Sequence, residues 1–254
     1  KNPMNHLKSF LFLLMLVSLT VWYYLVLLLW RGWFFIRGQH FPSNEAHKVA
    51  SRYCHKIFSF TPGWRLDISG EENLITSYQN KGCVLIANHE SSVDILAIYY
   101  LGIPFKWLSK RELFLFPAVG QAMRWARYIQ VRRGEHNSHK KALNDCSQLI
   151  GEGHSVLLFP EGTRSTLGHP KTFKKGAFIL ASKNQVPVVP IVLLGAGRLM
   201  KKNTLCPNPG VVRVKVLPPV FKKPEEALED FTQRVESLVV KEHQLLSQQH
   251  KSLS

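Results

Sequence analysis

Two residues in the first half of the chain, His89 and Asp94, have the side chains of a general base and its orienting acid. Imidazole, with an ordinary pKa of about 6.5, suits proton removal from an alcohol at neutral pH. An aspartate bonded to one ring nitrogen fixes the tautomer and leaves the other nitrogen to accept the proton. A five-residue step turns about 500° on a helix, so the two side chains can meet only across a loop-to-helix junction. Ser91 or Ser92 as the N-cap would provide that junction.

By itself, a His-x4-Asp pair is a weak signal. With 11 histidines and 4 aspartates in the chain, such a pair arises by chance roughly one time in six. The alternative interpretation makes His89 an ordinary loop histidine and Asp94 a helix-start residue stabilised by the helix macrodipole. The surrounding sequence has to decide between them.

A second polar loop, 159–165, follows an apolar run and has the sequence Phe-Pro-Glu-Gly-Thr-Arg-Ser. Gly162 permits a tight turn in which the backbone approaches a ligand closely. Arg164 offers a planar fork for two phosphate oxygens, and Thr163 and Ser165 add hydroxyl donors. Taken alone, the loop fits an ordinary strand-to-helix turn with exposed charges equally well.

Three cations come at or directly after expected strand ends: Lys110, Arg132 and Arg164. The carboxyl ends of parallel strands meet at one edge of a sheet, where open α/β folds gather their ligands. Convergence of the three cations there would build a pocket for a phosphate monoester beside the histidine base. The alternative is that each is a solvated surface cation.

These residues need a scaffold that brings strand ends together, and the body of the chain alternates short apolar runs with helical stretches. The alternation predicts an α/β fold with a largely parallel, buried sheet flanked by helices. Strands are expected at 82–87, 105–108, 128–131, 155–159, 186–194 and 211–217, and helices at 93–101, 112–126, 136–151 and 174–184. Pro187 and Pro190 weaken the strand at 186–194 or place it at an edge of the sheet.

The N-terminal stretch is the most apolar part of the chain. Residues 10–30 carry no charge and would span roughly 30 Å as a helix, the thickness of a hydrocarbon core. Aromatic residues gather toward the second end of this run, as they do at a lipid–water interface. We therefore expect a membrane segment, crossing the bilayer or entering one leaflet, rather than a cleaved signal peptide or a buried core helix. Residues 45–60 predict a basic amphipathic helix, suited to a membrane surface or to packing on the domain.

Composition limits the partners. The 254 residues carry 33 Lys+Arg against 17 Asp+Glu, a net charge of +16, and they are too apolar for disorder yet too mixed for a multi-span membrane protein. Beside an apolar anchor, this charge indicates an anionic membrane and a phosphate-bearing substrate rather than nucleic acid.

Four cysteines without a CxxC pair indicate neither a zinc site nor a disulfide-stapled domain, and point to a reducing environment. We divide the chain into anchoring helices at 1–60, an α/β domain at 61–223, and a C-terminal amphipathic helix with a polar tail at 224–254.

Several blocks, in the right order, resemble one family: the 1-acyl-sn-glycerol-3-phosphate acyltransferases. Residues 88–94 resemble its NHx4D motif, and residues 159–165 resemble its FPEGTRS motif. Residues 110–113 resemble the block after its second strand, 129–132 its second motif, and 186–191 its fourth. Together these blocks are far more specific than a single HxxxxD match.

The resemblance implies a glycerolphosphate acyltransferase-like fold with an N-terminal membrane-embedded helical pair. In such a protein His89 would be the general base and Asp94 its orienting partner. The acceptor phosphate would be bound by three cations, Lys110, Arg132 and Arg164. The site would be shaped by four residues of the second loop, Glu161, Gly162, Thr163 and Ser165.

The implied activity is transfer of a fatty acyl group from an acyl thioester to the sn-2 hydroxyl of lysophosphatidic acid, which forms phosphatidic acid. Acyl-CoA or acyl-carrier protein would be the co-substrate, and no metal or other cofactor is expected. The resemblance places the protein in a membrane of anionic phospholipid, the bacterial inner membrane, with the catalytic domain on the cytoplasmic side. Two alternatives stay open: the same chemistry on glycerol 3-phosphate or another lysolipid, and a non-catalytic basic membrane-binding module.

Overall fold

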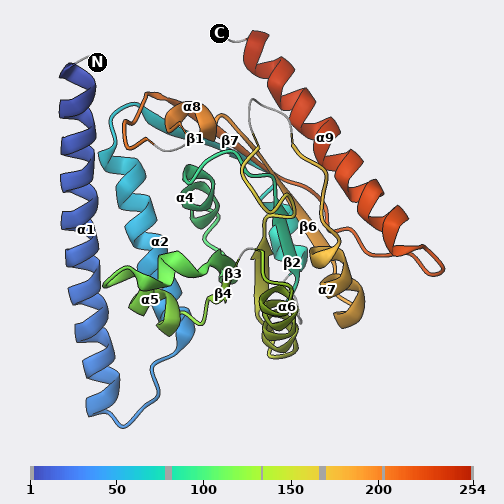
Figure 1. The fold of residues 1–254 in the computed structure, drawn as a ribbon, viewed down its shortest axis with the longest axis horizontal. Helices are drawn as coiled ribbons and strands as arrows, with labels where there is room; N and C mark the ends of the chain where they lie inside the picture. Colours follow the sequence, from blue (N-terminus) through green and yellow to red (C-terminus); the bar gives the residue numbers. More distant parts are fainter. Residues whose placement is uncertain (1–2, 78–81, 133, 166–169, 202–203, 253–254) are drawn as a thin grey trace.

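The computed structural model describes residues 3–252 except 78–81, 133, 166–169 and 202–203. Its seven strands are β1 (Trp64–Ser69), β2 (Val84–Ala87), β3 (Phe105–Lys110), β4 (Ile129–Val131), β5 (Ser155–Leu158), β6 (Val188–Leu194) and β7 (Gly210–Val216). They form one sheet in the order β1-β7-β6-β2-β5-β3-β4, and every pairing between them is parallel apart from β6 with β7. The expected largely parallel sheet is confirmed (Figure 1).

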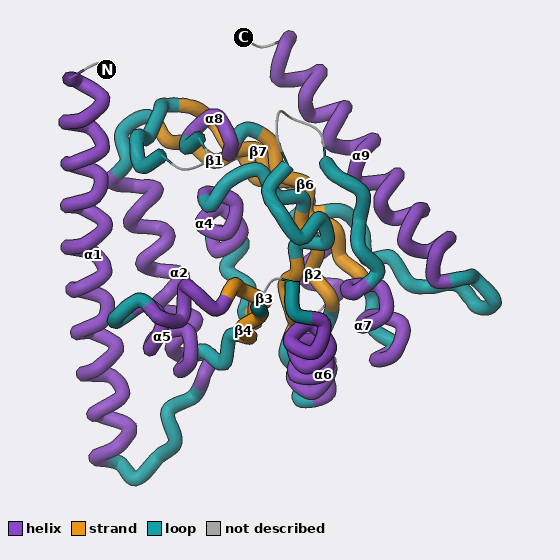
Figure 2. Tube along the Cα trace, in the orientation of Figure 1, coloured by secondary structure: helices purple, strands orange, loops and turns teal. Residues whose placement is uncertain are grey.

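Helices cover both faces of this sheet (Figures 1 and 2). The described helices are α1 (Pro3–Ile36), α2 (Ser43–Phe60), α3 (Glu72–Ser77), α4 (Val93–Tyr99), the 3-10 helix η1 (Arg111–Leu115), α5 (Val119–Trp125), α6 (His136–Gly151), α7 (Gly176–Asn184), α8 (Ala196–Leu199) and α9 (Leu228–Ser252). The expected strands and most expected helices are present within a few residues of their predicted bounds. Elements that the sequence analysis missed are β1, α3 and α8.

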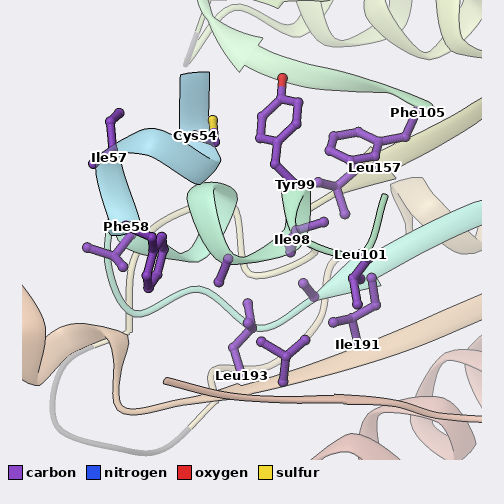
Figure 3. Close-up of a cluster of buried hydrophobic side chains, with 14 of the residues drawn as sticks. Cys54, Ile57, Phe58, Ile98, Tyr99, Leu101, Phe105, Leu157, Ile191 and Leu193 are labelled. Atoms are coloured by element: carbon purple, nitrogen blue, oxygen red, sulfur yellow. The ribbon is translucent and has the colours of Figure 1, made fainter. Parts of the chain in front are cut away.

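Side chains alternate along the central strands and divide the core into two layers. Leu85 and Leu157 belong to the layer packed under α2 and α4. Val84 and Val156 belong to the layer packed under α6, α7 and α9. Figure 3 shows the first layer, where side chains of α2 and α4 lie close to those of β3, β5 and β6. Because both of their faces are buried, the central strands β2, β5 and β6 are nearly continuous apolar runs, which is why the sequence revealed them.

One predicted helix, 112–126, is two elements in the structure. It is interrupted at Pro117, whose ring nitrogen has no hydrogen to donate, and at Ala118, which has a φ of 60°. The expectation of a continuous helix was therefore wrong. The C-terminal helix expected within 224–254 is α9, which continues to Ser252 and buries Leu246 to 7% exposure.

Pro190 lies in the middle of the sheet, contrary to the expectation of an edge strand. β6 is flanked by β7 and β2, and Pro190 pairs in register with Ile86. The carbonyl of Pro190 accepts the N–H of Leu217, just past the end of β7. The N and O atoms of one strand residue face the same neighbour, so the missing donor falls where β7 has already ended. A proline costs little at that position.

The N-terminal pair has one helix on the domain and one largely outside it. α2 buries Ile57 and Phe58 against the domain to 1% and 4% exposure, so its apolar face packs inward. Among the described residues, Met4–Ile36 is the one helix long and apolar enough to cross a membrane. Large apolar side chains of α1, such as Phe35 and Ile36 at 84% exposure each, have no protein cover. This is the arrangement expected of a membrane anchor.

The C-terminal helix α9 contributes to the core, and a truncation of its largest buried side chain tests this. Phe231 is fully buried and meets the Phe178 ring edge-on at 5.5 Å. Phe231→Ala should lower the free energy of unfolding by about 3–5 kcal/mol, measured by denaturant titration of the full chain in detergent. Leu245→Ala on the exposed side of α9, where the side chain is 41% exposed, is the control and should change it by less than about 0.5 kcal/mol. Equal losses of unfolding free energy in Phe231→Ala and Leu245→Ala would contradict a contribution of α9 to the core.

Candidate active site

His89 and Asp94 meet as the sequence predicted. The loop between β2 and α4 brings Nδ1 of His89 to 2.7 Å from Oδ2 of Asp94. The same oxygen accepts the backbone N–H groups of Glu90 (2.7 Å) and Ser91 (2.8 Å). Asp94 lies in the first turn of α4, and its carboxylate itself satisfies the N–H groups before the helix. Of the two serines expected to cap the helix, Ser92 makes no side-chain capping hydrogen bond, whereas the hydroxyl of Ser91 accepts the N–H of Val93 at 3.4 Å.

The pair has the electrostatics of an oriented base. The Asp94 side chain is fully buried, and this burial raises the pKa of the carboxyl, while the hydrogen bond from His89 lowers it. Because Nδ1 of His89 donates to the carboxylate, Nε2 is the ring nitrogen left to accept a proton. The ring lies against Phe159 with centroids 4.2 Å apart and is 15% exposed, so it is held and still reachable.

Asn88 fixes the start of this loop. Its side chain is fully buried and makes two hydrogen bonds of 2.8 Å with the backbone of Leu193 on β6. The amide side chain thereby continues the β2–β6 ladder one residue beyond the strand. The turn that carries His89 starts from this fixed position.

The second loop holds the backbone of the first. Glu161, which is 4% exposed, accepts the N–H of His89 through Oε1 (2.8 Å) and the N–H of Lys171 through Oε2 (3.1 Å). Its burial raises the pKa of the carboxyl, and these two backbone donors oppose that rise. Ser165 donates to the carbonyl of His89 from both its N–H (2.7 Å) and its hydroxyl (3.0 Å). Glu161 and Ser165 thus hold the main chain of His89 on both sides, one through its N–H and the other through its carbonyl.

Gly162 has a structural reason for lacking a side chain. Its φ is +71°, and a Cβ atom there would stand 2.9 Å from Nζ of Lys174. The Lys174 side chain therefore lies across the glycine, and its backbone N–H donates to the carbonyl of Pro160. Thr163 accepts a hydrogen bond from Nζ of Lys171, which also donates to the carbonyl of Arg164.

The three predicted cations lie at the carboxyl ends of neighbouring strands, as expected. Lys110 ends β3, Arg132 follows β4, and Arg164 lies in the loop after β5, in a sheet where β5, β3 and β4 are adjacent. Arg132 pairs with Glu135 at 3.2 Å on the exposed surface. The side chains of Lys110 and Arg164 have no acidic partner among the described residues, and no contact joins the three cations there.

Sequence reasoning missed four residues at the site. Lys171 and Lys174 support the second loop, and the lysine-rich run that follows this loop was the signal that could have revealed them. Glu90 and His243 form a buried pair, with Oε1 and Nε2 3.2 Å apart, at the back of the catalytic loop. They are 153 positions apart, so no local pattern could have joined them.

Fold and site together place the chain among α/β proteins with a His–Asp pair at the carboxyl edge of a largely parallel sheet. Residues 65–194 match the model of the family described as Acyltransferase, and the chain belongs to this family.

Named relatives agree with this membership. The chain is 39% identical over 173 residues to a chloroplastic 1-acyl-sn-glycerol-3-phosphate acyltransferase of Brassica napus, covering 68% of this chain and 50% of that protein. It is 42% identical over 183 residues to a 1-acyl-sn-glycerol-3-phosphate acyltransferase of Chlamydomonas reinhardtii, covering 69% and 54%. The chain thus spans about half the length of these relatives. The crystal structure of the 1-acyl-sn-glycerophosphate acyltransferase of Thermotoga maritima has the same fold, with a TM-score of 0.71, 24% identity, and coverage of 93% of this chain and 98% of that one.

The geometry predicts a specific defect for Asp94→Asn. Loss of the charged acceptor removes the preference for the tautomer with Nε2 unprotonated, so kcat for acyl transfer should fall about 10²- to 10⁴-fold. The midpoint of thermal unfolding should change little, because burial already opposes the charge of this carboxylate and raises its pKa. Kinetics with a radiolabelled acyl donor and thermal unfolding of the same preparation measure the two quantities. A variant with near wild-type kcat would remove Asp94 from the site.

Proposed function

We propose that the protein transfers a fatty acyl group from an acyl thioester to the sn-2 hydroxyl of lysophosphatidic acid, forming phosphatidic acid. The observation that carries the proposal is the buried Asp94 bonded to Nδ1 of His89, with Nε2 left as a base beside a basic loop. Membership in the Acyltransferase family and the names of the relatives support it.

In the proposed reaction, Nε2 of His89 takes the proton of the sn-2 hydroxyl while the oxygen of this hydroxyl attacks the thioester carbonyl carbon. The tetrahedral intermediate collapses, the carbon–sulfur bond breaks, and the leaving thiolate takes the proton from the imidazolium. A thioester is activated enough that no covalent acyl-enzyme is needed. The sequence contains no Gly-x-Ser-x-Gly elbow that would present a serine nucleophile. Cys83 is fully buried, and burial raises its pKa to about 11, so it does not supply a thiolate nucleophile.

The acceptor phosphate would bind at the cations of the strand ends, Lys110, Arg132 and Arg164. We add Lys174 to this set, because its ammonium lies over Gly162 of the second loop and has no acidic partner among the described residues. Its neighbour Lys175 is different, since it pairs with Glu229 of α9. A phosphate monoester carries a charge of about −1.5 to −2 at neutral pH and would be neutralised by two or three such cations.

The reaction would take place at a membrane. We propose that α1 anchors the chain in anionic phospholipid, that lysophosphatidic acid enters from the bilayer, and that acyl-CoA or acyl-carrier protein comes from the aqueous side without any metal or other cofactor. The bacterial inner membrane, with the catalytic domain on the cytoplasmic side, remains part of this proposal. The relatives include chloroplastic proteins as well as one from the bacterium Borreliella burgdorferi.

A panel of acceptors tests the proposed reaction. Purified full-length protein in detergent micelles is given radiolabelled acyl-CoA or acyl-carrier protein with lysophosphatidic acid, glycerol 3-phosphate, lysophosphatidylcholine or monoacylglycerol. We expect transfer to lysophosphatidic acid, and its loss in His89→Ala. Transfer to glycerol 3-phosphate alone would change the acceptor. Undiminished transfer in His89→Ala would remove its role as the base, and a wild-type protein that binds vesicles but acylates nothing would indicate a membrane-binding module.

Lys174 can be tested against the lysine next to it. Because hydrogen bonds to charged groups contribute about 1.5–3 kcal/mol, Lys174→Ala and Arg164→Ala should each raise the KM for lysophosphatidic acid at least about tenfold. Lys175→Ala should leave this KM unchanged. If Lys174→Ala and Lys175→Ala have the same KM as the wild type, Lys174 does not bind the phosphate.

A further inference from the structure

Glu90, the residue after the histidine base, has a nearly buried carboxylate between three segments of the fold. Its side chain is 10% exposed, and Oε1 lies 3.2 Å from Nε2 of His243. Its Oε2 accepts the backbone N–H groups of Gly195 (3.2 Å) and Gly197 (3.3 Å), between the end of β6 and α8. Breaking one of these bonds leaves a charge short of partners in a low dielectric, so the carboxylate holds its surroundings firmly.

His243 reaches this carboxylate from the C-terminal helix. Its side chain is 2% exposed, and α9 lies outside residues 65–194, the part of the chain that matches the family. α9 is fixed to the sheet by the buried Val235 and Val239 and by an ion pair of 2.7 Å between Lys215 of β7 and Glu242. The imidazole is therefore presented by an element whose position is set independently of the catalytic loop.

The main chain of Glu90 belongs to the catalytic geometry. Its N–H is one of the three donors to Oδ2 of Asp94, at 2.7 Å, and the ring of His89 is another. A displacement of Glu90 would therefore weaken the support of the carboxylate that orients His89. The chain of contacts runs from His243 to the Glu90 carboxylate, through the Glu90 peptide to Asp94, and from Asp94 to Nδ1 of His89.

We propose that His243 is a positioning residue that acts through Glu90 to hold the catalytic loop in the geometry that orients His89. The inference rests on the proposed function and extends it to a part of the chain outside the family match. His243 contacts none of the cations assigned to the acceptor phosphate in the described structure. Its loss should therefore lower kcat and leave the KM for lysophosphatidic acid unchanged.

Three single variants separate positioning from general support. His243→Ala should lower kcat about tenfold to a hundredfold, because small misplacements of a base cost that much. His243→Gln should recover most of kcat, since its amide can still donate to Oε1 of Glu90. Glu242→Gln, the matched control on the same helix, breaks the ion pair with Lys215 and should keep wild-type kcat. A kcat for His243→Ala within about twofold of wild type, or an equal loss in Glu242→Gln, would overturn the proposal.

A double-mutant cycle tests whether His243 acts through Glu90. If it does, Glu90→Ala combined with His243→Ala should have the kcat of Glu90→Ala alone, because the second change removes nothing further. Multiplication of the two single effects would show that His243 acts by another route. The amide oxygen of Glu90→Gln can still accept the N–H groups of Gly195 and Gly197. This variant therefore replaces Glu90→Ala in the cycle if Glu90→Ala fails to fold.

An NMR readout separates this inference from the proposed function. The proton that His89 Nδ1 shares with Asp94 should give a downfield resonance in full-length protein labelled at histidine, and His89→Ala assigns it by its loss. The resonance should shift or broaden in His243→Ala and remain unchanged in Glu242→Gln. If wild-type protein acylates no acceptor, the proposed function fails, and this resonance still decides the positioning role. An unchanged resonance in His243→Ala overturns the positioning role whatever the acceptor.

Discussion

Burial of a single carboxylate governs the site. Asp94 is fully inside the protein, where a carboxylate is costly unless hydrogen bonds compensate its charge. The compensation comes from the ring of His89 and from two consecutive backbone N–H groups, all at Oδ2. Two of these donors are consecutive main-chain groups of the loop, so the carboxylate that binds His89 also holds the backbone beside it. Burial opposes this charge and raises the pKa of the carboxyl, so the site keeps Asp94 at a cost in stability.

Most polar side chains around this carboxylate bind the protein's own main chain. Asn88 extends a ladder on β6, Glu161 accepts the N–H of His89, and Ser165 donates to its carbonyl. The two loops come from β2 and β5, which are neighbours in the sheet although 72 residues separate His89 from Glu161. Parallel pairing of these strands brings the loops to one edge, and the buried side chains then join them. Few side chains remain to meet a ligand: the imidazole of His89 and the cations of the strand ends, of which Arg132 also pairs with Glu135.

The charge of the chain divides along the same line. Of the 33 Lys+Arg, some are tied to acids on the surface, as Arg132 is to Glu135 and Lys175 is to Glu229. Others have no such partner among the described residues: Lys110 and Arg164 lie at strand ends, and Lys174 lies over Gly162. The apolar part of the composition divides as well: the sheet buries both of its faces, while α1 leaves much of its apolar surface outside the domain. The composition of the whole chain shows neither division.

The sequence alone predicted the largely parallel α/β sheet and the long apolar N-terminal helix from local periodicity, and the meeting of His89 with Asp94 from a motif that resembles the family. Its errors were local too: Pro117 breaks a helix that apolar spacing predicted as continuous, and Pro190 is tolerated inside the sheet because β7 ends beside it. Only the tertiary structure decided that Glu161 and Ser165 hold the N–H and the carbonyl of His89, that Gly162 makes room for Lys174, and that His243 meets Glu90. These contacts join segments far apart in the chain, and their energies come from burial and hydrogen-bond geometry that exist only once the sheet has formed.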